Sequence, residues 1–455
     1  MRATFLVRGL VALVTVSAAA AAQLGPPSPE RKAATEADYH ATLARLGITS
    51  MRPGADGYNK QAPNAVNYDE ARAGPSSPPP PLFTVPRPTP QWWEQVRRPQ
   101  LIRLLEDEMY GRVPATAPKI SWQLVSEKHE VRNDIAVDAR SYRGVSPGTP
   151  LAIELTETVP EKAHKVPLVL ELGFPEGFHF PGFPVPADPW TSQVLRRGWG
   201  YAIIVPYTVQ PDDGVGLKEG VIGAASGGRS RGLHDWGALR AWAWGASRAL
   251  DLFERDPRID ARHVAVEGLS RYGKAALVTI AFDPRFSLGF IGSSGAGGAK
   301  PLRRDFGERL ENLTASGEYH WFAPAFLRYG GPKTVNDLPF DAHTLIAVVA
   351  PRPLFISAGN LKEDGWVDPY GSFLAARQAS PAYRLLGVPG LVGDSRPQIN
   401  ETRAAGCIAY REHDAGHTTG PNWPAFLDFA QRVWTKGCRA ASAGRSDDRA
   451  ARATR

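Results

Sequence analysis

Cysteine is scarce in this chain, and its scarcity excludes one class of protein at the outset. The 455 residues include two cysteines, Cys407 and Cys438. Two cysteines are too few for the disulfide framework that replaces a hydrophobic core in small secreted proteins, although this pair could still bond in an exported chain. Internal repeats are also absent, and beyond the first residues no apolar run is long enough to cross a bilayer. With 43% hydrophobic and 22% charged residues, the composition is instead that of a globular protein with a sizeable core.

The chain also lacks a concentrated basic patch. Its formal net charge is +7, but Arg2 and Arg8 belong to the N-terminal leader and several other basic residues crowd the last twenty positions. The remaining basic residues are interleaved with acids, which predicts a solvated surface and no nucleic-acid partner.

A metal-binding motif is missing as well. His413 and His417 have the spacing of a zinc pair, but Asp414 follows His413 where a zinc protease has glutamate. Gly416 before His417 also argues against the helix that such a site needs. We therefore expect no metal and no cofactor.

The N-terminal leader predicts export. Basic residues precede the apolar run from Leu10 to Val16, and Ala18–Ala22 supplies small residues before Gln23. This pattern is a bacterial secretory signal peptide over residues 1–22, too short for a membrane span and without a following cysteine for a lipid anchor. We expect a secreted or periplasmic monomer with no membrane association.

Composition divides the mature chain into three parts. Residues 23–90 are polar and rich in proline, with GPSSPPPP at 74–81, so we expect an extended arm without a core of its own, either free or lying across the main domain. Residues 91–438 carry the periodic apolar pattern of a folded domain, to which the motifs described below assign catalysis. Residues 439–455 are poor in large apolar side chains and are predicted to be disordered.

The order of the elements within 91–438 predicts the fold class. A helix from Trp92 to Met109 precedes partly alternating, antiparallel strands, and continuously apolar strands and helices then alternate. This order predicts an α/β fold, with a mostly parallel central sheet, antiparallel N-terminal strands and helices on both faces. The elbow motif described next makes the expected fold class an α/β-hydrolase. The expected strands are 120–124, 135–142, 151–158, 166–172, 201–205, 263–267, 286–291, 354–356 and 408–410, and the main later helices are 235–254, 275–281 and 426–433.

The most informative segment is 263–274, which reads HVAVEGLSRYGK. A buried strand followed at once by a helix places Ser270 on the tight turn of a nucleophile elbow. The usual elbow has glycine two residues after the serine, whereas Tyr272 stands there and Gly273 comes one later. The alternative is that Ser270 is an ordinary helix N-cap.

A nucleophilic serine needs a base and an acid that orients it. His417 lies in the loop DAGHTTG at 414–420, after the last strand and before the last helix, where this fold carries its base; His343 is the structural alternative. The loop GNLKEDGWVDP at 359–369 follows the preceding strand, and Glu363, Asp364 and Asp368 are all eligible acids.

The combined motifs resemble those of the glucuronoyl esterases, carbohydrate esterase family fifteen, and specifically the bacterial members. The segment GLSRYGK resembles the family's G-C-S-R-x-G-K elbow, and further similar segments are DWGALRAW at 235–242, GAGG at 295–298, YHWF at 319–322, LPFD at 338–341 and the His417 loop. The resemblance covers roughly residues 92–434. It implies a serine esterase that acts on esters of (4-O-methyl-)glucuronic acid in glucuronoxylan. These ester bonds link the carbohydrate to lignin.

The resemblance also implies roles for individual residues. Ser270 would be the nucleophile, His417 the base, and Arg271 the stabiliser of the oxyanion. The sugar would be bound by Lys274, Glu308, Trp366 and, by a looser match, Glu318.

The chain departs from the family pattern in two ways. Where many members carry their triad glutamate this chain has Ser293, so the acid must come from the later loop, where Asp364 fits best by its spacing to Trp366. Leu269 and Thr418 stand where fungal members have a disulfide. Another carbohydrate esterase, acetyl or feruloyl, and an inactive carbohydrate-binding relative are the alternatives.

Overall fold

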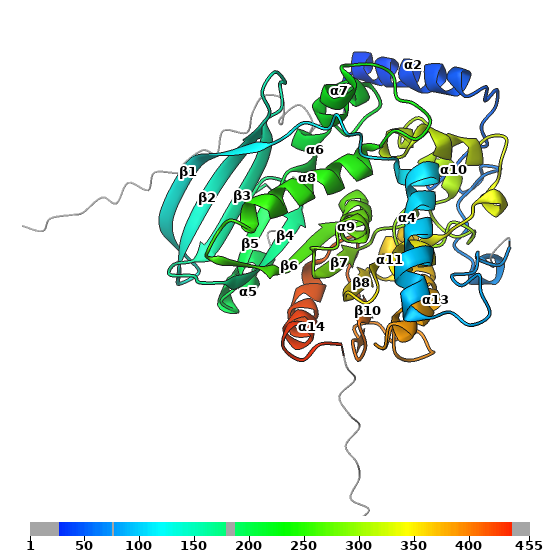
Figure 1. The fold of residues 1–455 in the computed structure, drawn as a ribbon. Helices are drawn as coiled ribbons and strands as arrows, with labels where there is room; N and C mark the ends of the chain where they lie inside the picture. Colours follow the sequence, from blue (N-terminus) through cyan, green and yellow to red (C-terminus); the bar gives the residue numbers. More distant parts are fainter. Residues whose placement is uncertain (1–26, 75–76, 179–186, 439–455) are drawn as a thin grey trace, which may run out of the picture.

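A single mixed sheet organises the molecule (Figure 1). The computed structural model describes residues 27–74, 77–178 and 187–438, so the predicted signal peptide and C-terminal tail lie outside it. Within these ranges the strand order is β1-β2-β3-β5-β4-β6-β7-β8-β10-β9. The strands are β1 (Ser121–Arg132), β2 (Ile135–Val145), β3 (Ile153–Pro160), β4 (Val166–Leu172), β5 (Gly200–Ile204), β6 (Ile259–Leu269), β7 (Leu288–Gly292), β8 (Leu354–Ala358), β9 (Thr402–Arg403) and β10 (Ile408–Glu412).

The pairing confirms the predicted division of the sheet. Strands β1, β2, β3 and β5 pair antiparallel in turn, whereas β5, β4, β6, β7, β8 and β10 run parallel. Only the two-residue β9 returns antiparallel at the far edge. The parallel strands are buried on both faces, which explains their continuously apolar sequences.

The first hairpin is longer than the sequence predicts. The strand expected to end at Leu124 continues to Arg132, and Leu124, Val125 and Val131 remain exposed. Because this extension is polar and packs on no core, it lacks the hydrophobic periodicity by which a strand is recognised.

Two helical layers cover the sheet (Figure 1). One face packs against α8 (Ala238–Phe253), α9 (Arg271–Phe282), α11 (Ala342–Val349) and α13 (Pro369–Leu385). The other packs against α5 (Trp190–Arg196) and α14 (Trp423–Lys436), where Trp423 stacks on Trp190. The sequence pattern missed α13, because this helix contains both Gly371 and Pro381.

Apart from α2 (Pro29–Arg45) and the helical run that enters the domain, the remaining helices are short. The predicted helix from Trp92 is a continuous run of α3 (Pro90–Trp92), a π-helical turn (Trp93–Arg97), α4 (Arg98–Leu105) and a second π-helical turn (Glu106–Tyr110), and it ends at Gly111. The others are α6 (Pro206–Val209), α7 (Gly220–Ser226), α10 (Leu310–Leu313), α12 (Leu361–Asp364) and the 3-10 turns Glu70–Arg72, Val215–Lys218, Tyr319–Trp321, Pro324–Tyr329, Val335–Asp337, Gly365–Val367 and Gly420–Asn422.

The N-terminal segment differs from the extended chain that its proline content predicts. It begins with the 17-residue helix α2 (Pro29–Arg45), capped by Ser28 and drawn in dark blue in Figure 1. Tyr39 and Leu43 are buried, and the Tyr39 hydroxyl donates to the carbonyl of Thr314 at 2.9 Å. The prolines concentrate nearer residue 80 and leave 29–45 free to form a helix, so in the described structure this segment lies across the catalytic domain.

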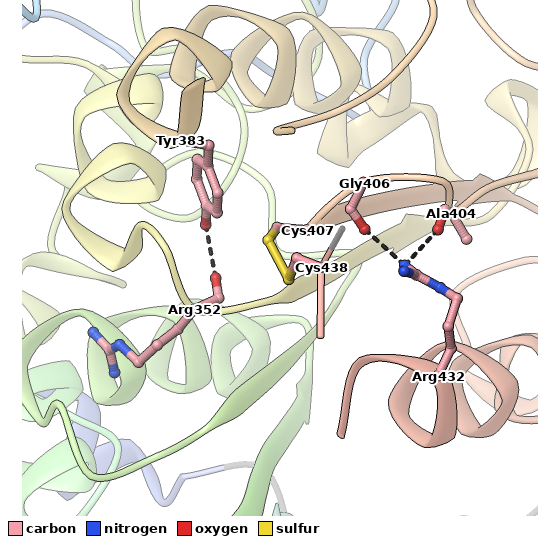
Figure 2. Close-up of a disulfide and its surroundings, with 7 residues drawn as sticks. All are labelled: Arg352, Tyr383, Ala404, Gly406, Cys407, Arg432 and Cys438. Atoms are coloured by element: carbon pink, nitrogen blue, oxygen red, sulfur yellow. Dashed lines mark hydrogen bonds between the residues drawn. A yellow bond between two sulfur atoms is a disulfide. The ribbon is translucent and has the colours of Figure 1, made fainter. Parts of the chain in front are cut away.

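The two cysteines are bonded to each other (Figure 2). Cys407 directly precedes β10 and Cys438 follows α14, so the bond fastens the last helix to the sheet. Arg432 of α14 adds hydrogen bonds to the carbonyls of Ala404 at 2.6 Å and Gly406 at 2.7 Å. No helix in the described ranges is both long and apolar enough to cross a membrane.

Candidate active site

Ser270 occupies a sharp turn between β6 and α9. Its backbone has φ 62° and ψ −129°, a left-handed conformation unusual for a residue with a side chain. A Cβ on Gly268 would lie 2.2 Å from the carbonyl oxygen of Tyr272, and one on Gly273 would lie 2.5 Å from that of Gly292. These close approaches explain why the elbow has glycine at 268 and at 273 while Tyr272 is tolerated between Ser270 and Gly273.

The hydroxyl of Ser270 does not cap the helix that follows it. No side-chain capping hydrogen bond is made to α9 by this residue, and its side chain is half-buried. The turn is held instead by the backbone, because Ser270 N–H donates to the carbonyl of Gly292 at 2.9 Å. The ordinary N-cap interpretation therefore does not describe this serine.

His417 and Asp364 form a hydrogen-bonded pair. His417 Nδ1 lies 2.7 Å from Asp364 Oδ1. Asp364 is 2% exposed, and its second oxygen accepts hydrogen bonds from the Ser293 hydroxyl at 2.6 Å and from Gly359 N–H at 2.8 Å. The His417 side chain is 42% exposed, so the imidazole is fixed by a buried carboxylate while remaining open to a substrate.

The other two eligible acids have different surroundings. Asp368 is fully buried, where it binds Arg304 at 2.7 Å and caps α13 through Gly371 N–H. Glu363 is exposed at the start of α12. Of the three carboxylates, Asp364 is the one in contact with His417.

The loop that carries His417 packs against the elbow. A Cβ on Gly292 would lie 2.4 Å from Thr419 Cγ2, and Gly292 is the residue whose carbonyl receives Ser270 N–H. The loop is also held from inside by His413 Nε2, 2.9 Å from the carbonyl of Thr418. The fold thus brings together residues separated by almost 150 positions.

Arg271, the residue after the serine, is anchored by an acid that the sequence pattern did not indicate. Its guanidinium lies 2.5 Å from Asp212 Oδ2. Asp212 Oδ1 accepts from Trp321 Nε1 at 2.6 Å and lies 2.9 Å from His320 Nε2. Burial alone would raise the pKa of Asp212, but the His320 hydrogen bond and the Arg271 charge outweigh it and hold the pKa well below its usual range. The one sequence feature that could have indicated Asp212 was its position in a polar loop after a central strand.

A second polar group begins one helical turn after Ser270. Lys274 Nζ lies 3.1 Å from Glu308 Oε2, and both side chains are buried. Glu308 Oε2 also accepts Ala296 N–H at 2.8 Å. Lys274 Nζ lies 5.5 Å from the ring centroid of Trp321, which also faces Arg271.

Glu318 is a partly unsatisfied member of this group. Its Oε2 is buried and has no hydrogen-bond partner among the residues that the structure describes. Burial, and after it the charge of Glu308, raises the pKa of Glu318 to about 8, although Lys274 and Arg271 oppose the shift. A protonated carboxyl of this kind can donate a hydrogen bond near neutral pH.

Trp366 lies beside Glu308 and against the N-terminal segment. Glu308 N–H donates to the carbonyl of Trp366 at 2.8 Å, and the indole is half-buried. A Cβ on Gly57 would lie 3.1 Å from Trp366 Cζ3. The segment before the catalytic domain therefore helps to place this ring.

His343, the histidine considered beside His417 for the base, has a structural contact. His343 is buried and its Nε2 lies 2.9 Å from the carbonyl of Pro80. Within the described ranges no cluster of three histidine, cysteine or acidic side chains could hold a metal ion.

The positions of the serine, the acid and the histidine in the fold define a class of enzyme. The serine follows a central parallel strand, the acid follows β8, and the histidine follows β10, which is the arrangement of serine hydrolases with an α/β-hydrolase fold. The elbow serine, the buried Asp364 and the imidazole of His417 all lie at the carboxyl edge of the sheet.

Comparison with known proteins identifies the family. The family model described as "Glucuronyl esterase, fungi" matches residues 231–387. The chain is 31% identical over 441 residues to carbohydrate esterase MZ0003 from an unknown prokaryotic organism, covering 86% of this chain and 96% of that protein. It is 39% identical over 171 residues to the 4-O-methyl-glucuronoyl methylesterase of Hypocrea jecorina, covering 36% of each chain.

A solved structure extends the likeness to the whole domain. A glucuronoyl esterase of carbohydrate esterase family 15 from Teredinibacter turnerae T7901 has a TM-score of 0.81 and 41% identity, covering 88% of this chain and all of the other. The protein belongs to carbohydrate esterase family 15, the glucuronoyl esterases.

Proposed function

We propose that this protein is an exported serine esterase that hydrolyses esters of (4-O-methyl-)glucuronic acid on glucuronoxylan and so cleaves lignin–carbohydrate ester links. The observation that carries the proposal is the buried Lys274–Glu308 pair, which lies one helical turn beyond the elbow serine. A general esterase needs a nucleophile and a base, but it has no use for a buried charged pair at this position. Such a pair can bind a sugar ring with several hydroxyls, because each hydroxyl can both donate and accept a hydrogen bond.

The reaction begins with attack on the ester. Ser270 Oγ attacks the C6 carbonyl carbon of the glucuronoyl ester while His417 takes the hydroxyl proton. Asp364 holds the imidazole tautomer that has its proton on Nδ1 and stabilises the imidazolium that forms. The 2.7 Å contact between these two side chains supports this assignment.

Arg271 stabilises the tetrahedral intermediate. Its backbone N–H stands at the start of α9, and its guanidinium is half-exposed and held by Asp212. Each well-placed donor to an oxyanion contributes about 3–4 kcal/mol to the barrier reduction. His417 then protonates the departing alcohol, and a water molecule activated by the same imidazole hydrolyses the acyl-enzyme.

We assign sugar recognition to the second polar group, which begins at Lys274. Lys274, Glu308 and Glu318 offer donors and acceptors to the ring hydroxyls, and Trp366 offers an apolar face for the ring. The esterified uronate is uncharged, so it needs no salt bridge. The free acid produced by hydrolysis is an anion that Arg271 and Lys274 attract.

The deciding experiment is an assay of the chain from Gln23 onwards, with benzyl and methyl esters of glucuronic acid beside an acetylated xylan control. We expect turnover of both glucuronate esters, loss of activity in Ser270→Ala, and little release of acetate. Preferential acetate release would identify an acetyl esterase instead. Measurable xylan binding with no esterase activity in the unmodified chain would identify a binding protein.

A further inference from the structure

Two glutamates lie side by side beneath the elbow, outside the set of residues assigned so far. Strands β4 and β6 pair in parallel, and the register sets Glu171 opposite Glu267. Side chains of register partners on neighbouring parallel strands project from the same face of the sheet. Glu267 is 1% exposed and lies three residues before Ser270.

This carboxyl pair has no cation of its own. Neither glutamate forms an ion pair with any residue in the described ranges, and Glu267 Oε2 is buried there without a hydrogen-bond partner. The next acidic group, Glu176, is bound by Arg132 and by the Tyr201 hydroxyl, so that arginine is already engaged. Of the two adjacent carboxyls, Glu267 is buried and Glu171 partly buried. Ionising both is unfavourable, and one retained proton removes the repulsion.

Electrostatics agrees with this geometry. Burial, reinforced by the charge of Glu176, raises the pKa of Glu171 to about 8. Burial and the neighbouring Glu171 raise the pKa of Glu267 well above its ordinary value, although a hydrogen bond with Thr419 opposes the shift. At neutral pH the pair therefore retains a proton, and the pKa of about 8 places the ionisation of Glu171 in the mildly alkaline range.

Thr419 connects the pair to the catalytic loop. Its hydroxyl acts on Glu267 and lowers the pKa of that carboxyl, and its methyl group packs against Gly292 at the elbow. His417 stands two residues earlier in the same short loop. A movement of Thr419 would therefore move the imidazole relative to Ser270.

We propose that Glu267, paired with Glu171, is a positioning residue that holds the His417 loop against the elbow through Thr419. The inference rests on the proposed role of His417 as the base. While the pair retains a proton, the two carboxyls do not repel each other and Thr419 keeps its place beside Glu267. When the pair is fully ionised, the repulsion from Glu171 outweighs the stronger attraction of Thr419 for an ionised Glu267. Glu267 is then displaced and the loop loses its contact.

The test compares three variants across pH 5 to 10, with kcat and KM measured on benzyl glucuronate. Glu267→Gln keeps the shape of a protonated carboxyl, so we expect kcat within about threefold of the unmodified enzyme at pH 7 and a loss of activity on the alkaline side that is shifted up by a pH unit or more. Thr419→Val removes the hydrogen bond, and we expect kcat to fall about tenfold at all pH values with KM nearly unchanged. Glu363→Gln, an exposed carboxyl next to the same loop, is the control and keeps the unmodified profile.

A second readout does not depend on activity. Above pH 8 Glu267→Gln should unfold at a higher temperature than the unmodified protein, because it removes the repulsion, and the difference should vanish near pH 5. An alkaline decline in Glu267→Gln equal to that of the unmodified enzyme, or a Thr419→Val variant with full kcat, would overturn the positioning role. Failure of the proposed function has a different signature, since the chain would then turn over no glucuronate ester while the pH-dependent stability difference persisted.

Discussion

The guanidinium of Arg271 lies 2.5 Å from the carboxylate of Asp212, although 58 residues separate the two in the chain. Asp212 also contacts Trp321 and His320, so it joins the elbow to the 3-10 turn that follows Glu318. A flexible arginine held in this way is already oriented before any negative charge develops on the substrate.

Replacing Asp212 by asparagine should therefore lower kcat. Asparagine keeps the size of the side chain but removes the charge that orients Arg271, and we expect about a tenfold fall in kcat with a smaller change in KM. Steady-state kinetics on benzyl glucuronate measures both. The neighbouring Asp213 binds Arg31 of α2 instead, so Asp213→Asn is the control and should retain its kcat. Equal kcat values in the two variants would contradict the role of Asp212.

Replacing the acid of the triad should separate Asp364 from its neighbours. Asp364→Ala leaves His417 without its partner, and we expect kcat to fall about 10³-fold or more. Glu363→Ala should change kcat little, because that carboxyl is exposed and does not contact the imidazole. Asp368→Ala removes the partner of Arg304 and a helix cap, so its main effect should be on stability. Similar losses of kcat per folded molecule in all three variants would refute the assignment of Asp364.

The raised pKa of Glu318 should appear in the pH dependence of stability. Burial raises this pKa from 4.5 to about 8, so between these values the folded state holds a proton that the unfolded chain has released. The free energy of unfolding contributed by this group therefore falls as pH rises from about 4.5 to about 8. Denaturant unfolding of Glu318→Gln should show a shallower decline over that range than the unmodified protein. A parallel pair of curves would mean that Glu318 is already ionised near neutral pH.

Breaking the bond between Cys407 and Cys438 should affect stability and leave catalysis intact. The bond closes a loop with a sequence separation of 31 residues, for which the entropy lost by the unfolded chain corresponds to about 3–4 kcal/mol. We expect the double variant Cys407→Ser, Cys438→Ser to unfold at a lower temperature with an unchanged kcat/KM at 25 °C. The double serine variant avoids a free thiol that could complicate the comparison. A loss of activity without a loss of stability would contradict this expectation.

The sequence by itself determined the parts of the molecule that depend on short-range pattern. Continuous apolar runs identified the buried parallel strands, with Val166 to Leu172 matching β4 residue for residue, and the motif around Ser270 identified the elbow. Local patterns also carried the family resemblance, because the elbow and the loops beside it are short and specific. Chain order was enough to name His417 and to limit the acid to three carboxylates, of which the family resemblance favoured Asp364.

Only the tertiary structure decided which groups meet. It buried Asp364 against His417, joined Asp212 to Arg271, and set Glu171 beside Glu267 on neighbouring strands. It also folded residues 29–45 into a helix and laid the N-terminal segment along Trp366. Hydrogen bonds, ion pairs and shared protons act over a few ångströms, whereas these partners lie tens to hundreds of residues apart in the chain. Their pairing is fixed by strand order and packing, and no local pattern of residues records it.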